Sequence, residues 1–197
     1  AFEDKSLKSS QLKKFLTQGE ENIGIIYRNL ERAAKLISSF KKVAVDQSHE
    51  ESRLFNVSEL LNEVLLTLAP QIKNSPYKIE LHCPKDLSIT SKPGPINQIL
   101  INLIINSFIH GFEGQEQGTI SITIMLLSEQ LNISYQDDGL GIEQQMKNKV
   151  FEPFTTTKRG SGGSGLGLHL VYNLITQALG GTIQLESELG KGVNFEI

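Results

Sequence analysis

Two glycine-rich stretches organise this sequence: Asp137-Asp138-Gly139-Leu140-Gly141-Ile142 and Gly163-Ser164-Gly165-Leu166-Gly167-Leu168. The first is led by acidic residues, and the second opens an apolar segment. Glycine is required where the backbone approaches a ligand closely or takes a positive φ. The start of a helix also offers free backbone N–H groups, which bind phosphates. Together the two stretches indicate a site for a phosphate-bearing ligand.

The segments around these turns predict a compact α+β domain. Helices are expected from Asn56 or Ser58 to about Lys73, from Pro95 to His110 and from Leu166 to Leu179. Strands are expected at 77–83, 87–90, 119–127, 131–137, 182–186 and 193–197. Helices on one side of a mostly antiparallel sheet form a two-layer α/β sandwich, which is the fold class that we expect.

Residues 12–40 carry a heptad pattern. The following positions alternate four and three residues apart, with charged residues between most of them: Leu12, Leu16, Gly19, Ile23, Ile26, Leu30, Ala33, Ile37 and Phe40. Such a stripe favours a long helix that packs against partner helices, as in a coiled coil or four-helix bundle. We therefore expect a homodimer; the alternative is a helix folded back on the following domain. Residues 46–53 have the composition of a linker, so we divide the chain into a helical segment, 1–50, and a domain, 51–197.

The composition narrows the class of protein. The 197 residues have a formal net charge of -3, 39% hydrophobic residues and a single cysteine, Cys83. A mildly acidic chain lacks the basic surface that nucleic-acid binding requires, so we expect no nucleic-acid partner. A single cysteine excludes an internal disulfide and fits a reducing compartment. Because neither a signal peptide nor a bilayer-spanning run is present, we expect a cytoplasmic segment without membrane contact, in a parent protein that is soluble or anchored in the inner membrane.

Polar side chains interrupt the apolar segment 95–110 at intervals of four residues: Gln98, Asn102, Asn106 and His110. They fall on one broad helix face. Burying an amide without a partner costs a few kcal/mol, so this stripe needs a ligand, a metal ion or partners inside the fold. Asp137, at the end of a strand, also has two interpretations. It either accepts hydrogen bonds from an exocyclic amine such as that of adenine, or bonds to its own loop.

The segment between the two glycine stretches has the composition of a lid. It begins with two phenylalanines around a proline, Phe151-Glu152-Pro153-Phe154, and continues as a polar and basic loop. A loop anchored at one end and polar beyond it is suited to close over a ligand and open again. Lys158 and Arg159 are either contacts for phosphate charge or solvated cations.

Four motifs in this order resemble the ATP-binding domain of sensor histidine kinases, within the GHKL group of gyrase, heat-shock chaperone, kinase and mismatch-repair ATPases. The resemblance begins at about residue 53 and extends to the C-terminus. Residues 102–107 look like the asparagine box and 137–141 like the first glycine box. Residues 151–154 look like the phenylalanine box and 163–167 like the second glycine box. The resemblance implies a Bergerat-type ATP-binding fold, with the heptad helix as the second helix of a dimerisation and phosphotransfer bundle.

The resemblance also implies roles for individual residues. Asn106 holds Mg²⁺ through its side-chain oxygen, Asn102 supports the phosphates and Asp137 binds the adenine amine. His110 and Lys158 join the asparagines as catalytic contacts to phosphate. The contacts to ATP expected on this basis are Asn102, Asn106, Asp137, Gly139, Gly141, Ile142, Phe154, Thr156, Gly163, Ser164, Gly165, Leu166, Gly167 and Leu168.

One position separates a kinase from a hydrolase. ATPases of this group that split ATP with water carry a glutamate four residues before the metal-binding asparagine, as general base. This chain has Asn102 there, which cannot take a proton from water. We therefore expect ATP and Mg²⁺ to be held under a lid formed by residues 143–162, and the γ-phosphoryl group to pass to a positioned nucleophile.

The four histidines do not match the phosphoacceptor of this family, which lies in the first bundle helix before an acidic residue. His49 precedes Glu50 but lies in the linker, and His82, His110 and His169 lie inside the domain. We expect a fragment that cannot phosphorylate itself, from a two-component kinase whose phosphohistidine serves a response regulator. The alternatives are a serine kinase with the same nucleotide site and a non-catalytic, nucleotide-sensing dimerisation module.

Overall fold

The structure is a computed structural model, and it describes residues 8–45, 51–158 and 163–197. The chain divides into two compact units, Ala1–Lys41 and Lys42–Ile197. The described part of the first unit is helical, and the second unit is a mixed α+β domain. The predicted linker residues 46–50, with His49, and the lid residues 159–162, with Arg159, lie outside the described residues.

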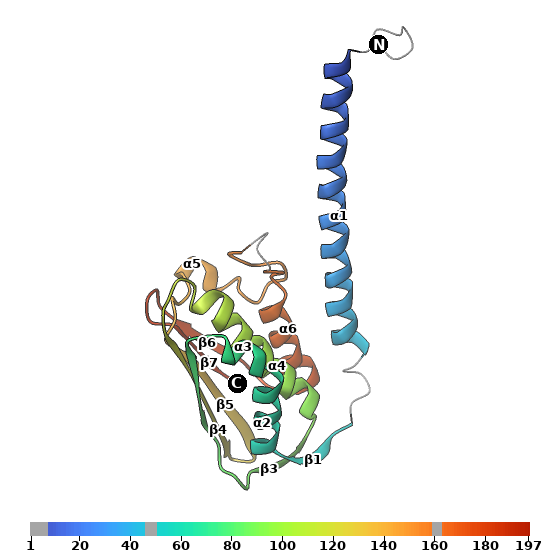
Figure 1. Cartoon of the computed structure of the whole chain (residues 1–197). Coiled ribbons are helices and arrows are strands. Elements are labelled where there is room, and N and C mark those ends of the chain that lie inside the picture. Colours follow the sequence, from blue (N-terminus) through green and yellow to red (C-terminus); the bar gives the residue numbers. More distant parts are fainter. Residues whose placement is uncertain (1–7, 46–50, 159–162) are drawn as a thin grey trace. The chain divides into compact units, whose positions relative to one another are not determined.

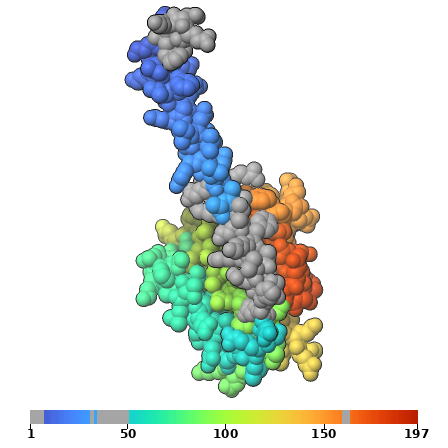
Figure 2. Space-filling view, turned by 90° about the vertical axis from the view of Figure 1, so that its right-hand side faces the viewer, coloured from blue at the N-terminus to red at the C-terminus, as the bar shows by residue number. Residues whose placement is uncertain are grey.

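Helix α1 runs from Ser9 to Val45, which confirms the helix predicted from the heptad pattern. Figure 2 shows α1, in blue, as a column one helix wide. Large apolar side chains cover much of its surface, and each is between 45% and 72% exposed: Leu12, Phe15, Leu16, Ile23, Ile25, Ile26, Tyr27 and Leu30. The side chains of Ile37 and Phe40, which continue the heptad pattern, lie outside those described. The described apolar surface is of the kind that a bundle helix buries against other helices.

The second unit is built on a five-stranded sheet with the order β2-β4-β5-β7-β6. Its strands are β2 (Tyr77–His82), β4 (Gly118–Leu127), β5 (Gln130–Asp137), β6 (Gln184–Ser187) and β7 (Val193–Glu196). β2 and β4 are parallel, and the other neighbours are antiparallel. The predicted strands are therefore present, in a mostly antiparallel sheet.

A separate two-stranded sheet pairs β1 (Arg53–Asn56) with β3 (Ser88–Ser91). The sequence did not predict β1, and the expected linker extended to its first residue. Phe55 pairs with Ile89 across this sheet. The segment is a strand because a distant part of the chain supplies its hydrogen bonds, and four residues show no periodicity of their own.

Three helices cover one face of the large sheet: α2 (Val57–Thr67), α4 (Pro93–Asn106) and α6 (Gly167–Asn173) (Figure 1). Short turns of π-helix extend two of them, η1 (Ser107–Gly111) after α4 and η2 (Leu174–Ala178) after α6. The short helices α3 (Ala69–Lys73) and α5 (Gln144–Lys147) complete the set. This is the two-layer α/β sandwich that the sequence predicts.

Helix α2 begins where the sequence predicts, because the Asn56 side chain accepts a hydrogen bond from the Glu59 backbone N–H at 3.0 Å. An N-cap of this kind stabilises a helix by about 1 kcal/mol. The single helix expected up to Lys73 is instead two helices, α2 and α3. Pro70 explains the break, because proline has no N–H to continue a helix but fits the first turn of a new one.

The core lies between the sheet and the helices. Alternate residues of β4 and β5 point into it, and the helices contribute the opposite layer: Ile120, Ile122, Ile124, Ile133 and Tyr135 from the strands, and Leu60, Val64, Ile99, Leu100, Leu103, Ile104, Val171, Leu174 and Ile175 from the helices. Each fully buried aliphatic side chain stabilises the fold by about 1.5–3 kcal/mol. This packing places the end of β5 beside the end of α4, where the polar residues gather.

Candidate functional site

A cavity of about 620 Å³ opens beside α4, η1, the end of β5 and the two glycine stretches. This volume is in the range of small-molecule sites. Most residues that the sequence singled out line it: Asn102, Asn106, His110, Asp137, Gly141, Ile142, Thr156, Gly163, Ser164, Gly165, Gly167 and Leu168. The fold thus brings motifs that are far apart in the sequence to one cavity.

Four predicted contact residues are not among those that line the cavity in the described part of the chain: Gly139, Phe154, Leu166 and Lys158. Gly139 packs on the backbone of Gly111, since a Cβ on Gly139 would stand 2.5 Å from the Gly111 carbonyl oxygen. Leu166 is buried, and Phe154 takes a φ of 68°. Lys158 points to the end of η1 instead.

Asp137 lines the cavity at the point where β5 ends. Its Oδ1 accepts hydrogen bonds from the backbone N–H groups of Gly139 at 3.1 Å and Val193 at 3.2 Å, and its Oδ2 accepts one from the Ser107 hydroxyl. Burial raises the pKa of the Asp137 carboxyl, and these three hydrogen bonds partly oppose the rise. Asp137 therefore bonds to its own loop, as one of the two sequence interpretations predicts, and it also lines the cavity. Its bond to an exocyclic amine stays a prediction.

Glycines hold the loops around Asp137 in close contact. Gly141 has a φ of 70°, and a Cβ there would stand 2.1 Å from the carbonyl oxygen of Glu188. Gly192 has a φ of 74°, and its Cβ would stand 1.8 Å from the Asp137 carbonyl oxygen. Only glycine fits either position. The role of Gly192 was not predicted, because it lies in another turn and meets the first glycine stretch only in the folded chain.

Residues of α4 and of the start of α6 also line the cavity. A Cβ on Gly167 would stand 3.2 Å from Asn106 Oδ1 and 3.7 Å from Asn102 Oδ1, so both amides face the second glycine stretch. Asn102 Nδ2 donates to the Gln98 carbonyl oxygen at 2.7 Å. Asn106 Nδ2 is buried and has no hydrogen-bond partner among the described residues. Since an unsatisfied buried amide costs about 1–3 kcal/mol, Asn106 has the character of a ligand-binding side chain.

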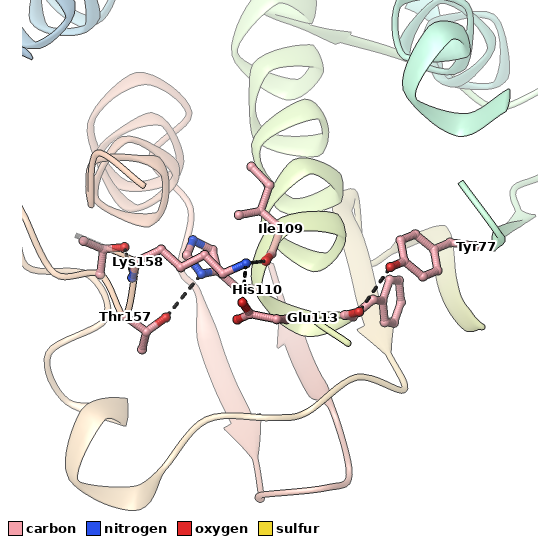
Figure 3. Close-up of polar contacts among 8 residues, drawn as sticks. Tyr77, Ile109, His110, Glu113, Thr157 and Lys158 are labelled. Atoms are coloured by element: carbon pink, nitrogen blue, oxygen red, sulfur yellow. Dashed lines mark hydrogen bonds and ion pairs between the residues drawn. The ribbon is translucent and has the colours of Figure 1, made fainter. Parts of the chain in front are cut away.

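Residues 157 and 158 of the predicted lid contact the segment that follows α4 (Figure 3). Lys158 Nζ donates to the Ile109 carbonyl oxygen at 2.6 Å and pairs with Glu113 at 2.9 Å. Thr157 Oγ1 lies 3.3 Å from His110 Nδ1. Burial lowers the pKa of His110, nearby Lys158 lowers it further, and Glu113 opposes them. His110 therefore lines the cavity as a mainly neutral ring at neutral pH.

The π-helical turn η1 follows α4 and also lines the cavity. The Phe112 backbone N–H donates to the Ser107 carbonyl oxygen at 2.8 Å, which closes the wide turn. The Gly111 carbonyl oxygen accepts from the Leu140 N–H at 2.7 Å, and the Tyr77 hydroxyl donates to the Phe112 carbonyl oxygen at 3.1 Å (Figure 3). Such turns are frequent at functional sites. Here the turn is bonded to both β2 and the first glycine stretch.

Sequence reasoning missed several residues that support the site. Tyr135 lies two residues before Asp137 on β5, so strand periodicity places both on one face, and this signal was available. Ser107 follows Asn106 in an apolar segment, where a lone hydroxyl is also a signal. The pairing of Glu113 with Lys158 had no signal, because the two residues are distant in the sequence.

Comparison with protein families agrees with this geometry. The family described as histidine kinase-, DNA gyrase B-, and HSP90-like ATPase matches residues 91–197. Sporulation kinase A of Bacillus subtilis is 30% identical over 189 residues, which cover 95% of this chain and 30% of that protein. The autoinducer 2 sensor kinase/phosphatase LuxQ of Vibrio cholerae is 42% identical over 112 residues, which cover 52% of this chain and 12% of that protein.

Solved structures show the same relationship. The catalytic domain of the histidine kinase ThkA is 33% identical, with a TM-score of 0.62, and the match covers 74% of this chain and 93% of that domain. ThkA in complex with the response regulator protein TrrA is 29% identical, with a TM-score of 0.63, over 98% of this chain and 52% of that chain.

The chain spans only part of its curated relatives, 30% of sporulation kinase A. Within the described residues, we find no helix with both the length and the apolar character needed to cross a membrane. The family match over the α4-to-β7 segment and the near-complete match to the ThkA catalytic domain lead to one conclusion. The chain belongs to the histidine kinase-, DNA gyrase B- and HSP90-like ATPases, and its ATP-binding domain is of the sensor histidine kinase type.

Proposed function

We propose that this chain binds Mg-ATP in the cavity and donates the γ-phosphoryl group to a histidine of a helical bundle that α1 helps to build. One observation carries the proposal. Asp137, an acceptor suited to the adenine amine, and Asn106, whose Nδ2 is buried without a hydrogen-bond partner among the described residues, both line one cavity. An adenine nucleotide carries a partner for each, an amine for the Asp137 carboxylate and phosphate oxygens for the Asn106 amide.

Asn106 fits the role of a magnesium ligand. Mg²⁺ prefers oxygen ligands and is commonly bound by one or two protein groups, with substrate phosphates and water supplying the rest. The described residues contain no cluster of three His, Cys, Asp or Glu side chains, so a dedicated all-protein cage is not available there. The Asn106 amide oxygen, which faces Gly167, would hold the ion against the phosphates. When bound, Mg²⁺ would neutralise phosphate charge.

Asn102 supports a kinase rather than a hydrolase. It occupies the position of the general base in hydrolytic relatives, and its amide is held by the Gln98 carbonyl oxygen at 2.7 Å. An amide at this position cannot take a proton from water. The chain's own contribution is then to position ATP and to exclude water through the proposed lid, residues 143–162.

The acceptor histidine is proposed to lie outside this sequence, so that the chain alone does not phosphorylate itself. His110 lies beside Thr157, and His169 Nδ1 donates to the Phe151 carbonyl oxygen at 2.9 Å, which anchors the start of the lid. These contacts give both rings roles within the domain. The exposed apolar surface of α1 supports homodimerisation through the segment 1–50, with 51–197 as the catalytic domain. The ThkA–TrrA complex supports a response regulator as the next partner.

Calorimetric titration with a non-hydrolysable ATP analogue tests the nucleotide site. We expect saturable binding that depends on Mg²⁺, a loss of about tenfold or more in Asp137→Asn, and a loss of the Mg²⁺ dependence in Asn106→Ala. Absence of saturable binding to the wild type would refute the proposal. For the transferred group, we expect acid-labile phosphate on the full-length parent given Mg-ATP; acid-stable phosphate on a partner would favour a serine kinase.

Light scattering tests the role of α1. We expect the whole chain to dimerise and residues 51–197 to be monomeric, because the apolar stripe of α1 is then absent. A dimer that persists after the truncation would place the interface in the catalytic domain.

A further inference from the structure

Three buried polar side chains form a chain behind the Asp137 end of the cavity. Tyr135, Ser107 and Asp137 are 0%, 4% and 3% exposed. Tyr135 and Asp137 come from the same face of β5, and Ser107 comes from η1. The Tyr135 hydroxyl lies 2.7 Å from Ser107 Oγ, and Ser107 Oγ in turn bonds to Asp137 Oδ2. Such a chain is more than core packing, because an apolar side chain at either hydroxyl position would avoid the cost of burying it.

The chemistry of the three groups fixes the direction of every hydrogen bond. An ionised carboxylate only accepts, so Ser107 donates its single hydrogen to Asp137. Ser107 then has only lone pairs left for Tyr135, so Tyr135 must donate to Ser107. Each hydroxyl hydrogen therefore points along the chain toward Asp137, and neither points into the cavity.

The hydrogen bonds that Asp137 makes within the described residues leave it one acceptor position. A carboxylate accepts about four hydrogen bonds, two on each oxygen. Oδ1 accepts from the backbone N–H groups of Gly139 and Val193, and Oδ2 accepts from Ser107. The remaining position is on Oδ2. Gly111 leaves room beside it, since a Cβ on Gly111 would stand 3.1 Å from Oδ2.

Ser107 and Asp137 both line the cavity, and together they present only acceptors to it. A ring that carries an exocyclic amine can donate a hydrogen bond to these acceptors. A ring with a carbonyl at the same place sets two acceptors against each other, and a ring with only hydrogen leaves the acceptor unpaired. Both mismatches cost binding energy, because Ser107 and Asp137 are buried and water cannot readily replace the missing hydrogen bond.

We propose that Ser107 and Tyr135 are positioning residues that make the site selective for a 6-amino purine: Tyr135 orients the Ser107 hydroxyl, and Ser107 holds Asp137 Oδ2 toward the ring. This inference rests on the proposed function, because it assigns the Asp137 end of the cavity to the base of the nucleotide. The proposal adds Ser107 and Tyr135 to the site, and neither is among the residues assigned above to phosphate or Mg²⁺.

Three triphosphates that differ mainly at ring position 6 provide the test: ATP with an amine, purine riboside triphosphate with hydrogen, and inosine triphosphate with a carbonyl. Each is titrated with Mg²⁺ into the wild type, Ser107→Ala and Tyr135→Phe. The readout is the ratio of affinities for ATP and each analogue within one variant. Loss of folded protein cancels in this ratio, so a purely structural role for either residue would leave it unchanged.

We expect the wild type to prefer ATP over purine riboside triphosphate by about tenfold or more, and over inosine triphosphate by at least as much. Ser107→Ala should reduce the preference to about threefold or less, because the carboxylate loses one of its three anchors. Tyr135→Phe should reduce it by a smaller factor, of about two to five, because Ser107 keeps its bond but loses its orientation. A wild-type ratio in either variant overturns the proposal. Failure of the wild type to bind ATP at all refutes the proposed function instead, so the two failures are distinguishable.

Discussion

Replacing Gly167 by alanine separates the stability of the fold from the function of Asn106. Gly167 begins α6 and carries no positive φ, so alanine can adopt its backbone conformation. The new Cβ would stand 3.2 Å from Asn106 Oδ1 and 3.4 Å from Asn106 Nδ2. The 3.2 Å contact is closer than ordinary van der Waals distance and the 3.4 Å contact is at its limit, so the Asn106 amide must move by a few tenths of an ångström.

The two consequences have opposite signs. Alanine is more favourable than glycine within a helix by about 1 kcal/mol, so the free energy of unfolding should rise by up to that amount. Metal ligands hold their distances within about 0.2 Å, so the displaced amide should bind Mg²⁺ poorly. Disturbing the support of a metal ligand typically costs about 10- to 100-fold in affinity, and we expect a loss of Mg-ATP affinity in this range.

The assay pairs chemical denaturation with calorimetric titration of Mg-ATP analogue. Gly19→Ala in α1 is a matched control, because it makes the same change in a helix at a site with nothing within 4 Å of the new Cβ. We expect this control to bind nucleotide as the wild type does. Wild-type affinity in a stable Gly167→Ala variant would refute the metal role of Asn106.

Two further predictions follow from the charges at each end of the site. The raised pKa of Asp137 means that the folded state holds its proton more tightly than the unfolded state, whose value is near 3.8. This group's contribution to stability therefore falls as pH rises from that value through the folded pKa, and ATP affinity is lost as pH falls through the folded pKa. Calorimetric titrations with ATP analogue across this pH range should show the wild type losing affinity at a higher pH than an ordinary carboxyl would give. Asp137→Asn should not show this loss. The same midpoint in both proteins would contradict the assignment of the loss to Asp137. Glu113→Gln should free Lys158 from its ion pair, changing stability by less than about 1 kcal/mol, because the Glu113 side chain is 56% exposed. ATP affinity should then rise by about two- to fivefold at low salt and show a steeper salt dependence, as long as Lys158 can reach phosphate. Glu116→Gln is the control, because Glu116 is a nearby exposed glutamate. An equal effect of the two substitutions on ATP affinity would reject competition between Glu113 and phosphate for Lys158.

The helices and most strands were predictable because their signals are local. The heptad pattern of α1, the alternation along β4 and β5, and the cap at Asn56 each depend on residues within a few positions. The split of α2 from α3 shows the limit of periodicity, since the apolar spacing continues to Leu68 while Pro70 prevents one continuous helix. β1 was missed because it is short and its partner, β3, lies far along the chain.

The candidate site was predictable in its list of residues but not in its arrangement. The glycine stretches and the Asn102–Asn106 stripe predicted much of the cavity lining. Glycine costs conformational entropy on folding and a buried amide costs desolvation energy, so both residue types indicate a close approach or a polar partner. The family resemblance implies that Lys158 contacts phosphate, which stays a prediction. In this structure its ammonium group bonds to the Ile109 carbonyl oxygen and Glu113. Competition between partners for one charge depends on distances that a sequence does not contain.

The sequence was enough to predict which residues contact a ligand or a partner. It indicated an acceptor at the end of β5, amides on α4, glycines at the loops and an apolar stripe on α1. The way in which these groups meet is visible only in the folded chain. Folding aligns Tyr135, Ser107 and Asp137 into one directed chain and sets Gly192 against the Asp137 carbonyl. Local patterns indicate whether a residue is buried, polar or at a turn. Its contacts are set by the packing of the whole sheet against the helices, because this packing joins segments that are distant in the sequence.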